Sequence, residues 1–224
     1  MILDVDGTLV DSNDAHARSW VDAFADHGIT VAYTDVRRSI GMGGDKLMPT
    51  VSGLEEESPE GRRIAERRAE IFKTAWLPRL RAFPATRDLV QRFLHDGFVL
   101  AVASSAKEDE LQPLLETAGV SDLITERTSS DDASNSKPDP DIVEAALGQT
   151  GCEASRAVMV GDTPYDVEAA RRAGVHVVGF ECGGWTARDL QAAGADEVYA
   201  DAADLLERYE GSIFARLAAL QGKN

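Results

Sequence analysis

The first residues of the chain, MILDVDGTLVDS, place acidic side chains close together directly after a short apolar run. Asp4 and Asp6 are two residues apart, and Asp11 follows them. Clustered carboxylates repel one another, so they indicate either a solvated surface loop or a site where chemistry is done. Other polar residues that could join them stand near later apolar runs: Ser104 and Ser105 after VLAVA, Lys137 in SKPDP, and Asp162 after AVMV.

Phosphoryl transfer is the chemistry that needs such a set. An aspartate can attack phosphorus as a nucleophile and split one difficult step into two easier ones. A carboxylate and a phosphate dianion repel each other, and Mg²⁺ held by carboxylates, water and the phosphate is the usual way to neutralise them. We therefore expect Asp4 to be the nucleophile, Asp4 and Asp162 to bind Mg²⁺, and Lys137 to hold the nucleophile and a phosphate oxygen.

Three further side chains fit supporting roles. Asp6 can lie on the leaving-group side, protonate the departing oxygen and later activate water. Ser104 can donate a hydrogen bond to a phosphate oxygen. Asp166 stands one helical turn after Asp162, so it would face the same way and support the metal ligands.

Each of these residues also has an ordinary structural explanation. A D-x-D-G-T sequence alone is a weak signal, and Lys137, Ser104 and Asp166 could be a surface lysine, a strand cap and a helix N-terminal acid. An EF-hand loop is excluded, because Leu9 and Ala15 stand where its glycine and bidentate glutamate should be. The coincidence of all these residues at the ends of predicted strands favours a site.

The elements that must position these residues follow from the apolar pattern. Beyond residue 84, short apolar segments alternate with amphipathic ones, as in a parallel sheet covered by helices on both faces. We expect an α/β fold, a doubly wound parallel sheet formed by residues 1–12 and 84–224, in which ligands bind at the carboxyl ends of the strands. The expected strands lie near residues 1–3, 98–105, 123–125, 157–162, 175–181 and 197–200.

Residues 13–83 show no strand-like alternation. Their apolar residues recur at spacings of three and four, which predicts an α-helical cap domain inserted into the core. The glycine-rich stretch IGMGGDKLM, residues 40–48, matches neither nucleotide-binding fingerprint. Two interpretations of this stretch stay open: a solvated surface segment with Lys46 in water, which is the more common case, and a loop that dips into the site and aims Lys46 at the substrate.

The composition limits the class of protein and its partners. The 224 residues are 43% hydrophobic and carry a formal net charge of −16. This charge argues against nucleic acid as a partner, and no apolar run approaches the roughly 20 residues of a membrane helix. Cys152 and Cys182 form no disulfide framework, so a reducing cytoplasm is the expected location. We expect a monomer or a small homo-oligomer.

Four segments in order, DVDGTLVDS, VASSAK, SKPDPD and VGDTPYDVEAA, resemble the signature motifs of the haloacid dehalogenase-like hydrolase superfamily. The resemblance covers essentially the whole chain. The segment before Phe83 and Pro84 is similar to the small helical cap of phosphoglycolate phosphatase and β-phosphoglucomutase relatives. The resemblance implies a Rossmann-like core, Mg²⁺ as cofactor and a small phosphorylated metabolite as substrate. The strand before Asp4 is shorter than is usual in relatives, and we expect it to weaken the edge of the sheet.

The resemblance also implies a role for each matching residue. Asp4 corresponds to the nucleophile and metal ligand, and Asp6 to an acid/base whose backbone carbonyl also binds the metal. The dehalogenases of the superfamily lack this second aspartate, so Asp6 favours phosphate chemistry. The remaining implied residues are the metal ligand Asp162, the phosphate-binding Ser104, Ser105 and Lys137, and the supporting Gly7, Thr8 and Asp166.

Three functions stay open at this point. The favoured one is a Mg²⁺-dependent phosphatase that acts on a small phosphomonoester through an aspartyl-phosphate. The second is a phosphomutase of the β-phosphoglucomutase type, and the third is a non-catalytic binding module on the same fold. The full set of Asp4, Asp6, Lys137 and Asp162 argues against the third.

Overall fold

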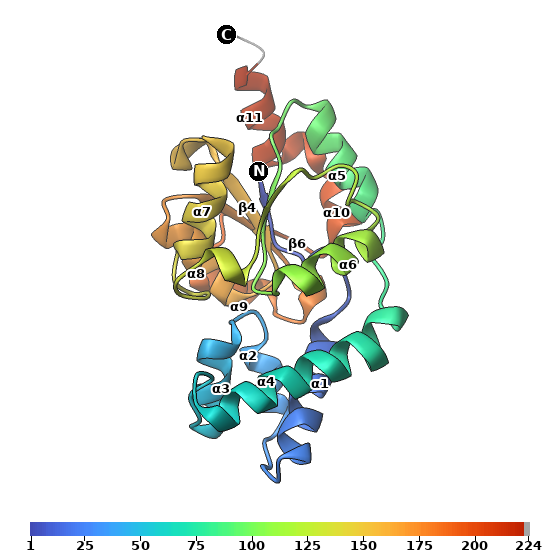
Figure 1. Cartoon of the computed structure of the whole chain (residues 1–224). Helices are drawn as coiled ribbons and strands as arrows, with labels where there is room; N and C mark the ends of the chain where they lie inside the picture. Colours follow the sequence, from blue (N-terminus) through green and yellow to red (C-terminus); the bar gives the residue numbers. More distant parts are fainter. Residues whose placement is uncertain (222–224) are drawn as a thin grey trace.

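Six parallel strands form one sheet in the order β3–β2–β1–β4–β5–β6 in the computed structural model, which describes residues 1–221 (Figure 1). The chain runs outward from β1 to β3, returns to the other side of β1 at β4, and continues to β6. This topology confirms the predicted doubly wound α/β fold. The strands are β1 (Ile2–Leu3), β2 (Ala101–Ala103), β3 (Glu126–Thr128), β4 (Val158–Gly161), β5 (His176–Phe180) and β6 (Glu197–Tyr199).

Helices cover the two faces of the sheet and bury the short strands between them (Figure 1). Successive side chains of a strand point to opposite faces, so Ile2 packs into one hydrophobic cluster and Leu3 into the other. The cluster with Leu3 lies under α5 (Thr86–His95), α6 (Glu108–Ala118), α10 (Ala202–Glu207) and α11 (Ile213–Gln221). The cluster with Ile2 lies under α7 (Asp141–Thr150), α8 (Pro164–Arg172) and α9 (Ala187–Ala193).

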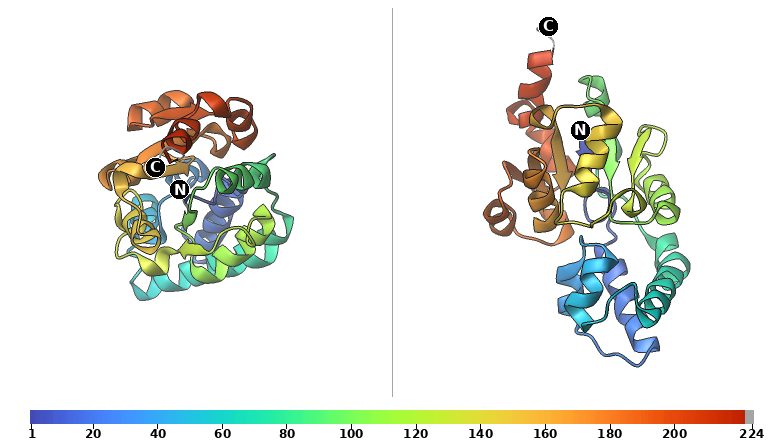
Figure 2. Two further views of the ribbon diagram at one scale, coloured as in Figure 1. Left: turned by 90° about the horizontal axis from the view of Figure 1, so that it is seen from above. Right: turned by 60° about the vertical axis from the view of Figure 1, so that its left-hand side comes forward.

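Four further helices lie together beyond the carboxyl ends of the strands (Figures 1 and 2). They are α1 (Asn13–Asp26), α2 (Tyr33–Ser39), α3 (Gly44–Ser52) and α4 (Pro59–Ile71). They pack around a hydrophobic cluster of their own, which includes Trp20, Phe24 and Ile64. A separate cluster supports the predicted cap, and its limits at residues 13 and 83 stay a prediction. Residues 222–224 of the predicted core lie outside the described residues.

The start of α4 shows how the sequence sets a helix boundary in the cap. The Ser58 side chain accepts a hydrogen bond from the backbone N–H of Gly61, and Pro59 occupies the first turn. Such a cap is worth about 1 kcal/mol, because it satisfies an N–H group that has no partner inside the helix. The chain then leaves α4 through a π-helical turn (Phe72–Trp76) and a 3₁₀ turn (Leu77–Arg79).

Some predicted elements are displaced in the structure. The strand expected at residues 123–125 is β3, at Glu126–Thr128, because the backbone N–H of Leu123 still bonds to the Val120 carbonyl in a turn. The single C-terminal helix is two helices, α10 and α11, separated by a turn at Tyr209–Gly211. The short first strand does not weaken an edge, because β1 lies between β2 and β4 inside the sheet.

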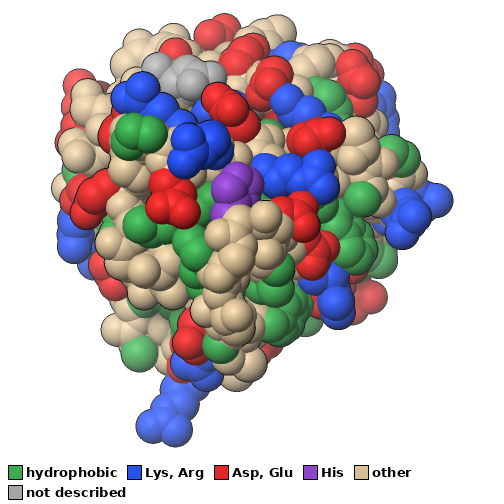
Figure 3. Space-filling model, turned by 60° about the horizontal axis from the view of Figure 1, so that its bottom comes forward, with side chains coloured by type: hydrophobic (Ala, Val, Ile, Leu, Met, Phe, Trp, Pro, Cys, Tyr) green, Lys and Arg blue, Asp and Glu red, His purple; other side chains and the backbone are tan. Residues whose placement is uncertain are grey.

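The surface of the cap end carries charges of both signs. Figure 3 shows acidic and basic side chains interspersed on this face, without a large area of one sign. Within residues 1–221, none of the helices combines the length and the apolar character that crossing a membrane requires.

The packing of α5 yields a stability prediction. Phe93 is fully buried against the rings of Phe98, Tyr209 and Phe214, whereas its neighbour Leu94 is 38% exposed. Phe93→Ala should lower the free energy of unfolding by about 3–5 kcal/mol, because it leaves a cavity in the core. Leu94→Ala should change it by no more than about 0.5 kcal/mol. Urea unfolding of both variants checks this, and equal losses would contradict the packing described.

Candidate active site

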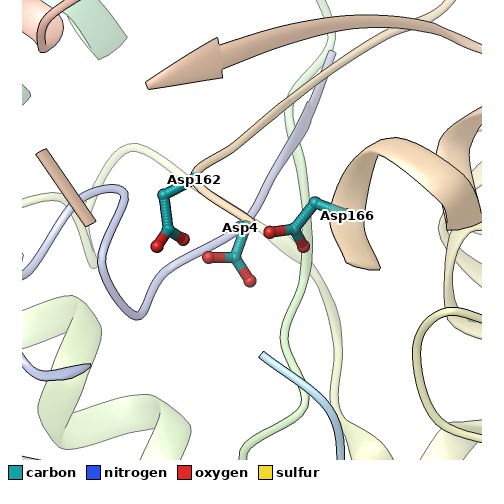
Figure 4. Close-up of side chains that lie close together, drawn as sticks. All are labelled: Asp4, Asp162 and Asp166. Atoms are coloured by element: carbon teal, nitrogen blue, oxygen red, sulfur yellow. The ribbon is translucent and has the colours of Figure 1, made fainter. Parts of the chain in front are cut away.

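Three aspartates lie close together between β1 and β4, the point at which the order of the strands in the sheet reverses. Asp4 follows β1, Asp162 follows the neighbouring β4, and Asp166 lies in the first turn of α8. Their carboxylates point toward one another, and one oxygen from each lies within 4.8 Å of the others (Figure 4). All three side chains are buried. The prediction that the strand ends converge therefore matches the geometry, since β1 and β4 are adjacent and parallel.

Lys137 is the buried cation of this cluster. Its Nζ lies 2.7 Å from Asp4 Oδ1 and 2.7 Å from Asp166 Oδ1. Burial opposes the positive charge of Lys137, but the two carboxylates outweigh this effect and raise the pKa of its ammonium group. Lys137 therefore stays protonated and orients the Asp4 carboxylate.

Hydrogen-bond donors from the first segment hold the other carboxylate oxygens. Thr8 Oγ1 donates toward Asp4 Oδ2 at 3.0 Å or Asp162 Oδ1 at 3.1 Å, and Asn13 Nδ2 donates to Asp162 Oδ2 at 2.8 Å. Gly7 has φ +79°, and a Cβ there would overlap Asn13 and Asp162. A glycine is needed here for both the backbone conformation and the space.

Local helix chemistry fixes Asp166. Thr163 and Asp166 form a reciprocal capping box at the start of α8, with Pro164 in the first turn. Asp166 Oδ2 accepts hydrogen bonds from the Thr163 backbone N–H at 3.0 Å and from the Thr163 hydroxyl at 2.7 Å. One oxygen of Asp166 thus serves the helix and the other serves Lys137.

The charge of the cluster fits a divalent cation. Burial raises the pKa of Asp4 to about 7 against the opposing effect of Lys137, and burial also raises the pKa of Asp162 well above its ordinary value. When ionised, three carboxylates beside one ammonium leave two negative charges. The buried Asn13 Oδ1 beside them has no hydrogen-bond partner among the described residues. Hard oxygen donors with this net charge suit Mg²⁺.

Asp6 lies apart from the three aspartates and has its own partners. Its Oδ1 accepts hydrogen bonds from Ser12 Oγ at 2.5 Å and His16 Nε2 at 2.7 Å. Burial opposes ionisation of Asp6, but the contacts with His16 and Ser12 and the charge of Arg68 outweigh it and lower the pKa of this carboxyl group. Asp4 and Asp6 both line a cavity of about 50 Å³ between the core and the cap.

The predicted phosphate-binding serines differ in position. Ser105 lines this cavity, and its hydroxyl donates to the Gly41 carbonyl at 3.2 Å. Ser104 is fully buried, and its hydroxyl accepts a hydrogen bond from the Ala106 backbone N–H at 3.0 Å. Phosphate binding by Ser104, Ser105 and Lys137 stays a prediction.

Lys46 is engaged elsewhere. The predicted loop forms only in part, because α3 begins at Gly44 and carries Lys46 on its first turn. Lys46 Nζ pairs with Asp139 Oδ2 at 2.5 Å and donates to the Ser136 carbonyl, so it ties the cap to the core. Ile40, Gly41 and Met42 do line the cavity, whereas Lys46 does not. Its contact with a substrate stays a prediction.

The residues that sequence reasoning missed come from the cap helices. Asn13 and His16 lie on α1, and Arg68 lies on α4 and donates to His16 Nδ1 at 2.7 Å. The chain has only four histidines, and His16 stands one helical turn after Ser12 and close to the acidic motif. This scarcity and spacing could have identified His16, but no pattern links it to Arg68.

Comparisons with known proteins agree with this geometry. The family model for haloacid dehalogenase-like hydrolase matches residues 1–180. The chain is 30% identical to phosphoglycolate phosphatase of Rhodospirillum rubrum over 213 residues, which cover 92% of this chain and 88% of the relative. It is 28% identical to Probable phosphatase IndB of Dickeya dadantii, over 86% of this chain and 85% of that protein. The crystal structure of a hydrolase from Pseudomonas syringae has a TM-score of 0.88 and 29% identity, over 94% of this chain and 97% of that one.

The family match extends through β1, β2 and β4, and therefore through all the strand ends that carry the clustered aspartates. The fold-level similarity covers nearly all of the chain, cap helices included. These findings confirm the predicted enzyme class, a phosphoric monoester hydrolase, and show that the chain belongs to the haloacid dehalogenase-like hydrolase family.

Proposed function

We propose that this enzyme is a Mg²⁺-dependent phosphatase that hydrolyses a small phosphomonoester through an aspartyl-phosphate on Asp4. The observation that carries the proposal is the position of the Asp4 carboxylate, which is buried, held by Lys137 and close to Asp162. The names of the relatives, phosphoglycolate phosphatase and a phosphatase, support the same reaction.

Asp4 and Asp162, together with the predicted backbone carbonyl of Asp6, would hold Mg²⁺. The cation would supply the positive charge that reduces repulsion between the carboxylates and the phosphate. Asp166 fits a supporting role, because both of its oxygens are already engaged by Lys137 and Thr163. If Lys137 were replaced by a neutral residue, the buried carboxylate of Asp166 would lose its positively charged partner, which is destabilising.

In the first step, Asp4 attacks phosphorus while Lys137 binds a phosphate oxygen. The new bond joins a carboxylate oxygen of Asp4 to phosphorus, and the bond from phosphorus to the leaving oxygen breaks. Asp6 gives its proton to that oxygen. The negative charge of a bound phosphate raises the pKa of the nearby Asp6 and favours the protonated form that this step requires.

In the second step, Asp6 acts as a base. Its carboxylate takes a proton from a water molecule, and the water oxygen attacks phosphorus and releases Asp4 and inorganic phosphate. His16 and Ser12 favour the carboxylate form of Asp6 through their hydrogen bonds. The same residue thus serves both half-reactions with opposite protonation states.

The substrate class we propose is a small phosphorylated metabolite, processed in the cytoplasm by a monomer or small homo-oligomer. The position of the 50 Å³ cavity between the core and the cap favours a small molecule over a macromolecule. A phosphate-release screen with Mg²⁺ across sugar phosphates, phosphoglycolate and nucleotides tests this directly. Steady release of phosphate supports the phosphatase, whereas an isomerised sugar phosphate with little release would support the phosphomutase instead.

Replacement of the nucleophile should abolish turnover. Asp4→Asn removes the attacking carboxylate, because an amide is a poor nucleophile, and should lower the rate of phosphate release by more than about 10³-fold. Asp11→Asn is the matched control, since Asp11 lies in the same segment but is exposed, and it should retain near-normal activity. Substantial turnover by Asp4→Asn would refute the assigned role.

Replacement of the acid/base should slow both half-reactions. Asp6→Asn should reduce the rates of formation and of hydrolysis of the aspartyl-phosphate by about 10²–10⁴-fold, because proton transfer is lost in each. Rapid-quench measurement of the phosphorylated enzyme separates the two rates. If only one of them fell, Asp6 would not serve both steps.

Replacement of a metal ligand should change the Mg²⁺ requirement. Asp162→Asn should raise the Mg²⁺ concentration for half-maximal activity by at least about tenfold, since one anionic ligand is lost. Asp189→Asn alters an exposed capping aspartate of α9 outside the site and serves as the control. An unchanged Mg²⁺ titration of Asp162→Asn would remove Asp162 from the ligand set.

A further inference from the structure

The buried side chain of Asn13 joins Asp162 to the loop that follows β5. Its Nδ2 donates to Asp162 Oδ2 at 2.8 Å and to the Gly183 carbonyl at 3.0 Å. A backbone carbonyl can only accept a hydrogen bond, so the atom that faces Gly183 must be the amide nitrogen. The orientation of the amide is thereby fixed, and its Oδ1 is left for another partner.

Two glycines leave the space in which this pair of side chains lies. A Cβ at Gly7 would lie 2.1 Å from Asn13 Nδ2, and a Cβ at Gly183 would lie 1.7 Å from Asp162 Oδ2. Asn13 is 2% exposed, and Asp162 is fully buried. The backbone therefore packs closely on both members of the pair, and the bond from Asn13 to Asp162 Oδ2 also fixes the direction of the other carboxylate oxygen.

The partners of Asp162 are neutral, unlike those of the two aspartates beside it. Both of these aspartates are paired with Lys137, whereas Asp162 forms no ion pair within residues 1–221. Its contacts are with the hydroxyl of Thr8 at 3.1 Å and with the amide of Asn13. A neutral donor holds a carboxylate in place without cancelling its charge, so the charge of Asp162 stays available to a divalent cation.

The remaining polar atom of the Asn13 amide is an acceptor without a partner. Asn13 Oδ1 is buried and accepts no hydrogen bond from the described residues. Buried acceptors in folded proteins are normally bonded to protein or to water. Mg²⁺ in proteins usually keeps several water molecules, and each of them can donate hydrogen bonds. A water molecule bound to a cation at Asp162 is therefore a suitable donor for this atom.

We infer that Asn13 is a positioning residue of the cation site: its amide nitrogen fixes the carboxylate of Asp162, and its Oδ1 accepts a hydrogen bond from a water molecule that the cation carries. This inference rests on the proposed function, in which Asp162 binds Mg²⁺. Asn13 neither binds the cation directly nor touches the substrate in this role. Because Asn13 is the first residue of α1, a cap helix supports a ligand that follows a strand of the core.

Calorimetric titration of the metal-free protein with Mg²⁺ measures this role without a substrate. Asn13→Ala and Asn13→Leu should each weaken Mg²⁺ binding by about 10–100-fold, the usual effect of losing a group that orients a metal ligand. Leucine keeps the volume of the side chain and alanine does not, so agreement between the two variants excludes a packing effect. Wild-type affinity in both variants, or a loss in Asn13→Leu alone, would overturn the inference.

Gln112→Leu is the matched control, because it also replaces a side-chain amide by leucine. Gln112 lies on α6, and its Nε2 donates to Glu116 Oε1 at 2.6 Å, away from the three aspartates. This variant should bind Mg²⁺ as the wild type does. A loss of affinity as large as that of Asn13→Leu would show that the effect does not depend on the contact with Asp162, and would overturn the inference.

Urea unfolding with EDTA and with Mg²⁺ separates the positioning role from a purely structural one. Mg²⁺ should raise the free energy of unfolding of the wild type, because it binds the folded protein. At the same Mg²⁺ concentration this increase should be smaller in Asn13→Ala, whatever the stability of that variant in EDTA. Equal increases in the two proteins would mean that Asn13 contributes to stability alone, contrary to the inference.

A crystal structure with Mg²⁺ tests the role of Oδ1. A water molecule bound to the cation should lie within hydrogen-bond distance of Asn13 Oδ1, and an Oδ1 bonded to any other group would contradict this. Phosphate release by a wild type whose Mg²⁺ affinity does not depend on Asn13 would refute the inference and leave the proposed function standing. Mg²⁺ binding that depends on Asn13, without any phosphate release, would refute the proposed function instead.

Discussion

The structure depends on the electrostatics of three buried carboxylates and one buried ammonium group. Asp4, Asp162 and Asp166 have oxygens within 4.8 Å of one another, and Lys137 contacts two of them. An uncompensated charge in such surroundings costs several kcal/mol, so the fold must supply either protons or a further cation. The raised pKa values of Asp4 and Asp162 show the first of these, and Mg²⁺ would provide the second. A phosphate dianion can bind beside these carboxylates only after their negative charge has been compensated.

The fold brings this cluster together through the adjacency of β1 and β4, and the cap then encloses it. Contacts between cap and core recur around the site: Lys46 with Asp139, Arg68 with Glu110, and Ser105 with Gly41. They leave an inner cavity of about 50 Å³ that borders on Asp4 and Asp6. In the proposed mechanism the two tasks lie on different parts of the fold: the nucleophile Asp4 and the metal ligand Asp162 follow strands of the sheet, whereas His16, a partner of the acid/base Asp6, lies on cap helix α1.

Much of the core could be predicted because it depends on local periodicity. Apolar runs located β1 and β4, and the rule for parallel sheets then brought Asp4 and Asp162 together. The position of β3 was wrong by three residues, because apolar Leu123 belongs to the preceding turn and apolar Ile124 to the irregular segment before the strand. Periodicity reports burial and not backbone conformation, so a short apolar segment outside a strand resembles a strand in sequence.

The contacts of the cap could not be predicted in the same way. Contact of Lys46 with the substrate stays a prediction, and its ion pair with Asp139, 93 residues away in the sequence, could not be predicted. His16, Arg68 and Glu110 come from three different helices, and only the packing of the cap on the core brings them together.

The most direct test of the central assignment is a crystal structure grown with Mg²⁺ and beryllium fluoride, a phosphoryl mimic. The ion should be bound by Asp4 and Asp162 with the mimic attached to an Asp4 oxygen, whereas an ion elsewhere or an unmodified Asp4 would contradict it.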